Sequence, residues 1–251
     1  MASLRDILFF CAGLALCALA WLLVEQFILQ PRRKRNLIRR DTNRIALAAQ
    51  ARVSQIEDPF LLVTGDSLVS QLLLGPVPDL AVIDIAFPGL ASGEFAERIG
   101  AIMSTPRTVT RPLVTILSIG ANDALQRDMA GEAARAAVLE TVEKIGGILE
   151  GSQATLLLSL PRLAPASAYA DRSASMDRLN EELRAFAARR NWIFFDCAAA
   201  LTAVPMDQMT SDGLHLSPQA NGVLARSLRQ AVRELIINGR PMAENQQKPS
   251  S

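Results

Sequence analysis

The sequence predicts an α/β fold with three layers, in which helices cover both faces of a five-stranded parallel sheet. Short apolar runs alternate along the chain with segments of helical periodicity, which implies right-handed crossovers between parallel strands. Half of the 251 residues are hydrophobic, and this length allows one α/β domain of about 180 to 200 residues. The runs predicted as strands are Phe60–Val63, Leu80–Ile85, Leu113–Ile119, Thr155–Leu160 and Trp192–Phe195.

Helices are predicted between these runs and after the last of them. The final helix begins at Ser217-Pro218, because serine caps a helix and proline suits its first turn, and it continues to about Ile236. Residues 237–251 are polar and predict a disordered tail. The other predicted helices are Leu68–Leu74, Phe95–Met103, Glu132–Leu149 and Ser175–Arg190.

The first 30 residues predict a transmembrane anchor. Residues Ile7–Val24 form a run of 18 without a charge, and apolar character continues to Leu29. A helix of about 20 apolar residues is needed to cross a bilayer, so residues 1–30 suffice. The alternative is a cleaved signal peptide with Ala18-Leu19-Ala20 as its small-residue site, but the apolar run continues well past that site.

A basic linker follows the predicted anchor and covers residues 31–57. Its positive charges outnumber those before the anchor, where Arg5 and the terminal amine stand beside Asp6. Lysine and arginine are retained on the cytoplasmic side, so the charge bias favours a domain on the cytoplasmic face of the membrane. The basic residues of the flank are Arg32, Arg33, Lys34, Arg35, Arg39 and Arg40.

Composition argues against two further classes of function. The formal net charge is +1, which disfavours a dedicated nucleic-acid surface. Cys11 and Cys17 lie in the apolar segment and Cys197 stands alone, so the chain has no CxxC motif and no cluster of cysteine with histidine. The sequence therefore predicts neither a metal site nor a cofactor.

A serine stands where the first predicted strand ends and a helix begins. Gly65-Asp66 breaks the apolar run, and Ser67 follows at the carboxyl end of the strand, where open α/β sheets place their ligand crevices. A neutral serine hydroxyl is a poor nucleophile, so it needs a base and a group that orients that base. The single histidine, His215, is the candidate base, and Asp212 is close enough in sequence to bond its other ring nitrogen.

Three short blocks follow one another along the chain: Gly65-Asp66-Ser67-Leu68, Gly120-Ala121-Asn122-Asp123 and Asp212-Gly213-Leu214-His215. Together and in this order, they resemble the SGNH (GDSL) hydrolase family. The resemblance covers roughly residues 58–236 and implies an SGNH-hydrolase domain with a flavodoxin-like sheet. It also implies that Ser67, Asp212 and His215 form a catalytic triad. Many relatives work outside the inner membrane, so the periplasmic face is the alternative location.

The resemblance also implies an oxyanion hole, which needs preorganised hydrogen-bond donors. Its donors would be the backbone N–H of Ser67, the side chain of Asn122 and the N–H of a glycine after the second strand. Gly89 fits this last role best, with Gly93 as the alternative. Pro88 departs from the family pattern at this point.

Several neighbouring residues have structural explanations that compete with functional ones. Asp66 is expected to hold the turn or cap a helix, and Asp123 to bind backbone amides. Isolated arginines are usually solvated, and methionine and leucine near the histidine usually pack in the core rather than line an acyl pocket. The residues left open in this way are Arg127, Arg162, Met206, Met209 and Leu214.

The expected activity is that of a membrane-anchored serine hydrolase that cleaves an acyl ester through an acyl-enzyme. An acetylated glycan, a lysolipid or a short acyl ester would suit such a site equally. Besides this substrate, the lipid bilayer is the expected partner. An acyltransferase would use the same residues with an alcohol in place of water, and a non-catalytic scaffold tethered to the membrane is the remaining alternative.

Overall fold

The computed structural model describes residues 19, 21–104, 111–126, 132–163 and 167–238. The chain forms two compact units, Met1–Arg44 and Ile45–Ser251. In the first unit, the π-helix η1 (Glu25–Leu29) leads into the helix α2 (Gln30–Val53), which continues into the second unit.

Most of the predicted transmembrane segment lies outside the described residues. Among the residues that are described, no helix is both long and apolar enough to cross a membrane. The described apolar residues at this end, Leu19 and those from Trp21 to Val24, are exposed.

The second unit is built on a parallel sheet of five strands in the order β2-β1-β3-β4-β5. All five predicted strands are present, each with bounds shifted by one or two residues. The chain moves outward from β1 to β2 and then crosses back to β3, so the direction of winding reverses between β1 and β3. Ligand crevices of open α/β sheets lie at such a reversal, beyond the carboxyl ends of the strands. The strands are β1 (Phe60–Gly65), β2 (Ala81–Ala86), β3 (Pro112–Ser118), β4 (Ala154–Leu158) and β5 (Ile193–Phe195).

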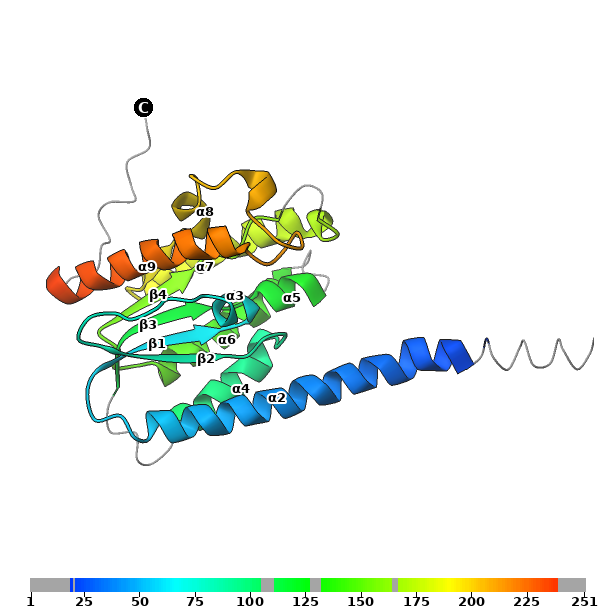
Figure 1. Cartoon of the computed structure of the whole chain (residues 1–251), viewed down its shortest axis with the longest axis horizontal. Helices are drawn as coiled ribbons and strands as arrows, with labels where there is room; N and C mark the ends of the chain where they lie inside the picture. Colours follow the sequence, from blue (N-terminus) through cyan, green and yellow to red (C-terminus); the bar gives the residue numbers. More distant parts are fainter. Residues whose placement is uncertain (1–18, 20, 105–110, 127–131, 164–166, 239–251) are drawn as a thin grey trace, which may run out of the picture. The chain divides into compact units, whose positions relative to one another are not determined.

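Helices cover both faces of the sheet (Figure 1). The long helix α9 (Pro218–Asn238) lies on one side, with α4 (Ser92–Met103) and α6 (Glu132–Ile148) on the other. The helix α7 (Ser173–Arg189) packs beside α6. This arrangement confirms the predicted three-layer fold.

The two layers of core follow from the alternation of side chains along each strand. On β1, Leu61 and Val63 are buried in one cluster with Leu224 and Leu228 of α9. Leu62 lies between them in sequence, is completely buried as well, and points to the opposite face. A strand buried on both faces is continuously apolar, which is why β1 could be recognised in the sequence.

The helix predicted over Leu68–Leu74 is shorter in the structure. It is α3, which covers Ser67–Ser70, and Gln71 forms its carboxyl-terminal cap. Beyond the cap, Leu72 and Leu74 are buried whereas Leu73 is 85% exposed. This alternation belongs to an extended segment, and the glycine and prolines that follow it disfavour a longer helix.

Four short elements were not predicted. None of them has enough residues to show a helical period in the sequence. They are α5 (Ala121–Gln126), η2 (Ala170–Arg172), α8 (Cys197–Ala200) and η3 (Met206–Gln208). Two of them are important for the site, because α5 begins directly after β3 and η3 leads into the segment that carries the histidine.

Candidate active site

Ser67 lies at the carboxyl end of the central strand β1, as the first residue of α3. Gly65, two residues earlier, has a φ of +150°, and a Cβ atom there would lie 2.1 Å from the backbone oxygen of Ser118. Only glycine therefore allows β1 and β3 to approach so closely at this point. The backbone N–H of Asp66 donates to the Ser118 oxygen at 3.2 Å and fixes the position from which Ser67 projects.

Asp66 is the amino-terminal cap of α3, as predicted. Its Oδ1 accepts a hydrogen bond from the N–H of Leu68 at 3.0 Å, and the side chain is buried. Burial raises the pKa of Asp66 from 3.8 to about 6, although the hydrogen bond from Leu68 acts in the opposite direction. Its Oδ2 has no hydrogen-bond partner in the described structure. This carboxylate is a cap, and the base that contacts Ser67 comes from elsewhere.

His215 lies in a tight loop between η3 and α9. Thr210 and Leu216 form an antiparallel bridge at its base, and the N–H of Ser211 donates to the oxygen of His215 at 2.9 Å. Gly213 has a φ of +84°, and a Cβ atom there would lie 2.9 Å from Oγ of Ser167. The loop therefore needs glycine at this position both for its backbone and for its packing.

The side chain of His215 lies within hydrogen-bond distance of both Ser67 and Asp212. Nε2 of His215 lies 3.1 Å from Oγ of Ser67, and Nδ1 lies 2.7 Å from Oδ2 of Asp212. An ionised carboxylate only accepts hydrogen bonds, so Nδ1 carries the proton and Nε2 accepts a hydrogen bond from the hydroxyl of Ser67. The arrangement is that of a nucleophile, a base and a group that orients the base.

Asp212 is held in the ionised state by its bonds. Oδ1 accepts hydrogen bonds from the N–H groups of Leu214, at 3.0 Å, and His215, at 2.7 Å. The hydrogen bond from the His215 side chain, followed by these backbone bonds, lowers the pKa of Asp212 from 3.8 to about 2. The side chain of Asp212 is 54% exposed, so the carboxylate is oriented by its bonds while still open to water.

Asn122 and Gly89, the predicted oxyanion donors, stand at the carboxyl ends of the two strands beside β1. Nδ2 of Asn122 is buried and has no hydrogen-bond partner in the described structure, which leaves a donor available to a ligand. Residues 87–90 have the features of a type II turn: Pro88 at the second position and Gly89, with a φ of +79°, at the third. The N–H of Leu90 closes the turn on the oxygen of Phe87 at 3.4 Å.

The Pro88 that departs from the family pattern therefore has a structural role, since proline favours the second position of this turn. Gly93, the alternative to Gly89, lies in the first turn of α4, and a Cβ atom there would contact nothing within 4 Å.

Asp123 binds backbone, as predicted, and its partner is Ser92 at the start of α4. The N–H of Ser92 donates to Oδ2 at 2.8 Å, and its hydroxyl donates to Oδ1 at 3.1 Å. Both residues are buried. The sequence did not identify Ser92 as the partner of Asp123. The only indication there is its position just before a helical pattern.

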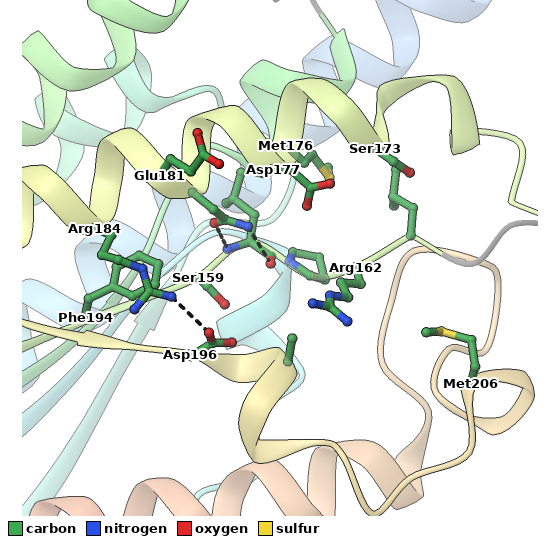
Figure 2. Close-up of a pocket in the computed structure, with 15 residues that line it drawn as sticks. Ser159, Arg162, Ser173, Met176, Asp177, Glu181, Arg184, Phe194, Asp196 and Met206 are labelled. Carbon is green, nitrogen blue, oxygen red and sulfur yellow. Dashed lines mark hydrogen bonds and ion pairs between the residues drawn. The ribbon is translucent and has the colours of Figure 1, made fainter. Parts of the chain in front are cut away.

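A pocket of about 500 Å³ opens at the carboxyl ends of β4 and β5 (Figure 2). Arg184 forms an ion pair with Asp196, in which Nη2 lies 3.0 Å from Oδ2. The Cζ atom of Arg184 also lies over the ring of Phe194, 4.3 Å from its centroid. One face of α7 contributes polar side chains to the pocket at intervals of four residues. This spacing is visible in the sequence, but it did not identify these residues as part of a pocket. These are Ser173, Asp177 and Glu181.

The residues whose role the sequence did not decide lie in different surroundings. Met209 is buried in the core cluster, Leu214 is half-buried, and Met206 and Arg162 line the pocket. Arg127 lies outside the described residues. In the part of the chain that the structure describes, no group of three histidine, cysteine or acidic side chains is placed to hold a metal ion.

Solved structures with a similar fold are known from several bacteria. A protein from Streptococcus pneumonia, provisionally described as a platelet activating factor, has a TM-score of 0.64 at 18% identity, with 80% of this chain and 97% of that chain covered. A GDSL-like lipase from Bacteroides thetaiotaomicron has a TM-score of 0.60 at 15% identity, covering 77% and 97%. The lipase/acylhydrolase from Enterococcus faecalis has a TM-score of 0.54 at 20% identity, covering 70% and 96%.

At these identities the likeness concerns the fold. No curated protein matches the chain. The sequence model of the GDSL-like lipase/acylhydrolase family matches residues 64–223, which include the segments of Ser67, Asn122 and His215. The chain therefore belongs to the GDSL-like lipase/acylhydrolase family, and it is a GDSL-type hydrolase.

Proposed function

We propose that the protein is a serine hydrolase that cleaves an acyl ester through a triad of Ser67, His215 and Asp212. The observation that carries this proposal is the contact of His215 with both partners, 3.1 Å from Oγ of Ser67 and 2.7 Å from Oδ2 of Asp212. These distances are within the range at which a base can take a proton from the nucleophile.

The first half of the reaction forms an acyl-enzyme. Oγ of Ser67 attacks the carbonyl carbon of the ester while its proton passes to Nε2 of His215. Asp212 keeps the Nδ1 proton in place and stabilises the imidazolium. When the tetrahedral intermediate collapses, the imidazolium gives its proton to the leaving oxygen, and the alcohol departs.

The second half restores the enzyme. Water takes the place of the alcohol, gives a proton to Nε2 of His215 and attacks the acyl carbon. The collapse of this second intermediate returns the proton to Oγ of Ser67 and releases the acid.

Both intermediates carry negative charge on the former carbonyl oxygen. We assign three donors to this oxygen: the N–H of Ser67, the N–H of Gly89 and Nδ2 of Asn122. The first is at the start of a helix, where no carbonyl four residues earlier accepts it. The last is a buried donor without a partner, which supports its role in binding an oxyanion.

Replacement of Ser67 by alanine tests this proposal. The full chain is assayed on a short acyl ester and treated with a fluorophosphonate, which labels activated serine hydroxyls covalently. We expect Ser67→Ala to lose activity by a factor on the order of 10⁶ and to lose all labelling. Activity that persists in this variant would show that the nucleophile is another residue. Folded wild-type protein that is neither labelled nor active would instead favour a scaffold.

We further propose that residues 1–30 anchor the protein in a membrane, with the domain on the cytoplasmic face. The support is the uncharged run Ile7–Val24 and the excess of lysine and arginine over residues 32–40. An anchored domain reaches ester substrates at the bilayer surface.

The ester assay also measures transfer of the acyl group to an added alcohol, since an acyltransferase and a hydrolase share the acyl-enzyme.

A further inference from the structure

The carboxylate of Asp123 joins the two segments from which the second and third oxyanion donors come. Asp123 follows Asn122 directly, and its partner Ser92 stands three residues after Gly89. The two hydrogen bonds from Ser92, at 2.8 and 3.1 Å, use both carboxylate oxygens. Asp123 is 1% exposed and Ser92 is 3% exposed. Buried hydrogen bonds to a charged acceptor are among the strongest that a protein makes.

The turn that carries Gly89 is held at its other end by β1. The N–H of Phe87 donates to the oxygen of Gly65 at 2.8 Å, and the N–H of Asp66 donates to the oxygen of Ser118 on β3 at 3.2 Å. Hydrogen bonds therefore connect the end of β1 to the turn and to β3. The hydrogen bonds between Ser92 and Asp123 add the remaining connection, from the segment that follows the turn to α5.

We propose that Asp123 is a positioning residue of the hydrolase, which sets the distance between the Gly89 N–H and the Asn122 side chain. The inference rests on the oxyanion roles proposed above for these two groups. Oxyanion donors act because they are already placed at about 2.7 to 3.1 Å from the developing charge. A displacement of about 1 Å lowers the rate by about 10²-fold, so the tie between the two segments affects turnover.

The first test replaces Asp123 by leucine in the full chain. Leucine has nearly the branched shape of aspartate but carries no acceptor, so both hydrogen bonds from Ser92 are lost. We expect kcat to fall by about 10²-fold while KM changes by less than about threefold. The matched control is Asp58→Leu, the same chemical change at an exposed residue before β1, which keeps the wild-type kcat.

A double variant separates positioning from a general structural effect. If Asp123 acts through the oxyanion hole, Asp123→Leu lowers kcat by less than about threefold in an Asn122→Ala background, since the hole has already lost a donor. A purely structural role predicts the same factor in both backgrounds, and this result would overturn the inference. If Asn122→Ala alone keeps the wild-type kcat, the oxyanion assignment fails first.

Ser92 provides a second route if Asp123→Leu does not fold. Ala91 has φ −72° and ψ 160°, the extended conformation that a residue before proline adopts, and proline fits the first position of a helix. Ser92→Pro removes both hydrogen bonds and is expected to reproduce the 10²-fold loss in kcat. Ser92→Ala keeps the shorter bond and is expected to lose less. A Ser92→Pro enzyme with wild-type turnover would contradict a positioning role.

Discussion

At the scale of single residues, the proposed chemistry depends on one imidazole. His215 is the single histidine of the chain and contacts both Ser67 and Asp212. Its two ring nitrogens have different tasks, because Nδ1 carries the proton and Nε2 has to be free to accept one. The state of Nδ1 is set by Asp212, so the orienting carboxylate is expected to matter nearly as much as the base.

Asp212→Asn tests this dependence. The amide retains the size of the side chain, but it can donate to Nδ1 and thereby favour the tautomer with its proton on Nε2, which cannot accept from Ser67. We expect kcat on a short acyl ester to fall by about 10⁴-fold. Asp207→Asn, on the exposed segment η3 before the loop, serves as the control and keeps its activity. A tenfold loss or less in Asp212→Asn would assign the orienting role to another group.

At the scale of elements, the site is assembled by short segments that follow the central strands. The turn over residues 87–90 follows β2, α3 follows β1, and α5 follows β3. The turn and α3 hold their polar groups by local chemistry: a proline and a glycine in the turn, and an aspartate cap on α3. The segment α5 is held instead by the contact of Asp123 with Ser92. The sheet then brings the segments to one edge because its strands are parallel.

Alanine substitutions at two glycines of this region are expected to have opposite effects on stability. Gly89→Ala places a side chain at a φ of +79°, which costs about 1 to 2 kcal/mol and shifts the turn, so both the unfolding midpoint and kcat are expected to fall. Gly93→Ala adds a methyl group in open space within a helix and is expected to stabilise the protein by up to about 1 kcal/mol with unchanged activity. Thermal unfolding and ester hydrolysis of both variants measure the difference. The reverse order of the two in kcat would assign the oxyanion donor to Gly93.

At the scale of the whole molecule, the buried Asp66 links the stability of the hydrolase unit to pH. The pKa of Asp66 is about 6 in the folded protein, above its ordinary 3.8, because burial disfavours the ionised form. The folded state therefore binds a proton more tightly than the unfolded state does. The stability that this group contributes is present below about pH 4 and is lost as the pH rises towards 6.

The size of this effect follows from the shift, which corresponds to about 3 kcal/mol. We expect the free energy of unfolding of the wild type, relative to Asp66→Asn, to decrease by an amount of this order between pH 4 and pH 7. The asparagine variant does not titrate, so the difference between the two proteins cancels the contributions of other groups. Urea unfolding followed by circular dichroism measures it. A difference that does not change with pH would mean that Asp66 is ionised at pH 4.

The proposed anchor is also a property of the whole molecule. We expect the full chain to float with lipid vesicles and to resist extraction by carbonate. The double substitution Leu14→Arg and Leu16→Arg is expected to release it, because each arginine at the centre of a membrane helix costs about 2.5 to 3.5 kcal/mol. Protease treatment of sealed vesicles of either orientation reports the face. Digestion of the domain in right-side-out vesicles would contradict a cytoplasmic location.

The sequence alone was sufficient for the features that depend on local pattern. The central strand β1 was recognised because a strand buried on both faces is continuously apolar, as β1 is from Phe60 to Val63. The edge strand β2 is apolar apart from Asp84, which is exposed. The start of the last helix was visible in Ser217-Pro218, and α9 indeed begins at Pro218. The three residues of the proposed triad could also be selected from the sequence. A serine, a histidine and an aspartate that stand at the ends of apolar runs form a rare combination.

Which of these residues meet depends on the packing of segments that are distant in sequence. The contact between Ser67 and His215 spans 148 positions, and its distance of 3.1 Å depends on the order of the strands and the path of the loop before α9. The bond between Asp123 and Ser92 and the end of α3 at Ser70 depend in the same way on neighbours distant in sequence. A local pattern reports only the preferences of adjacent residues, whereas a contact between distant segments is set by the packing of the whole sheet.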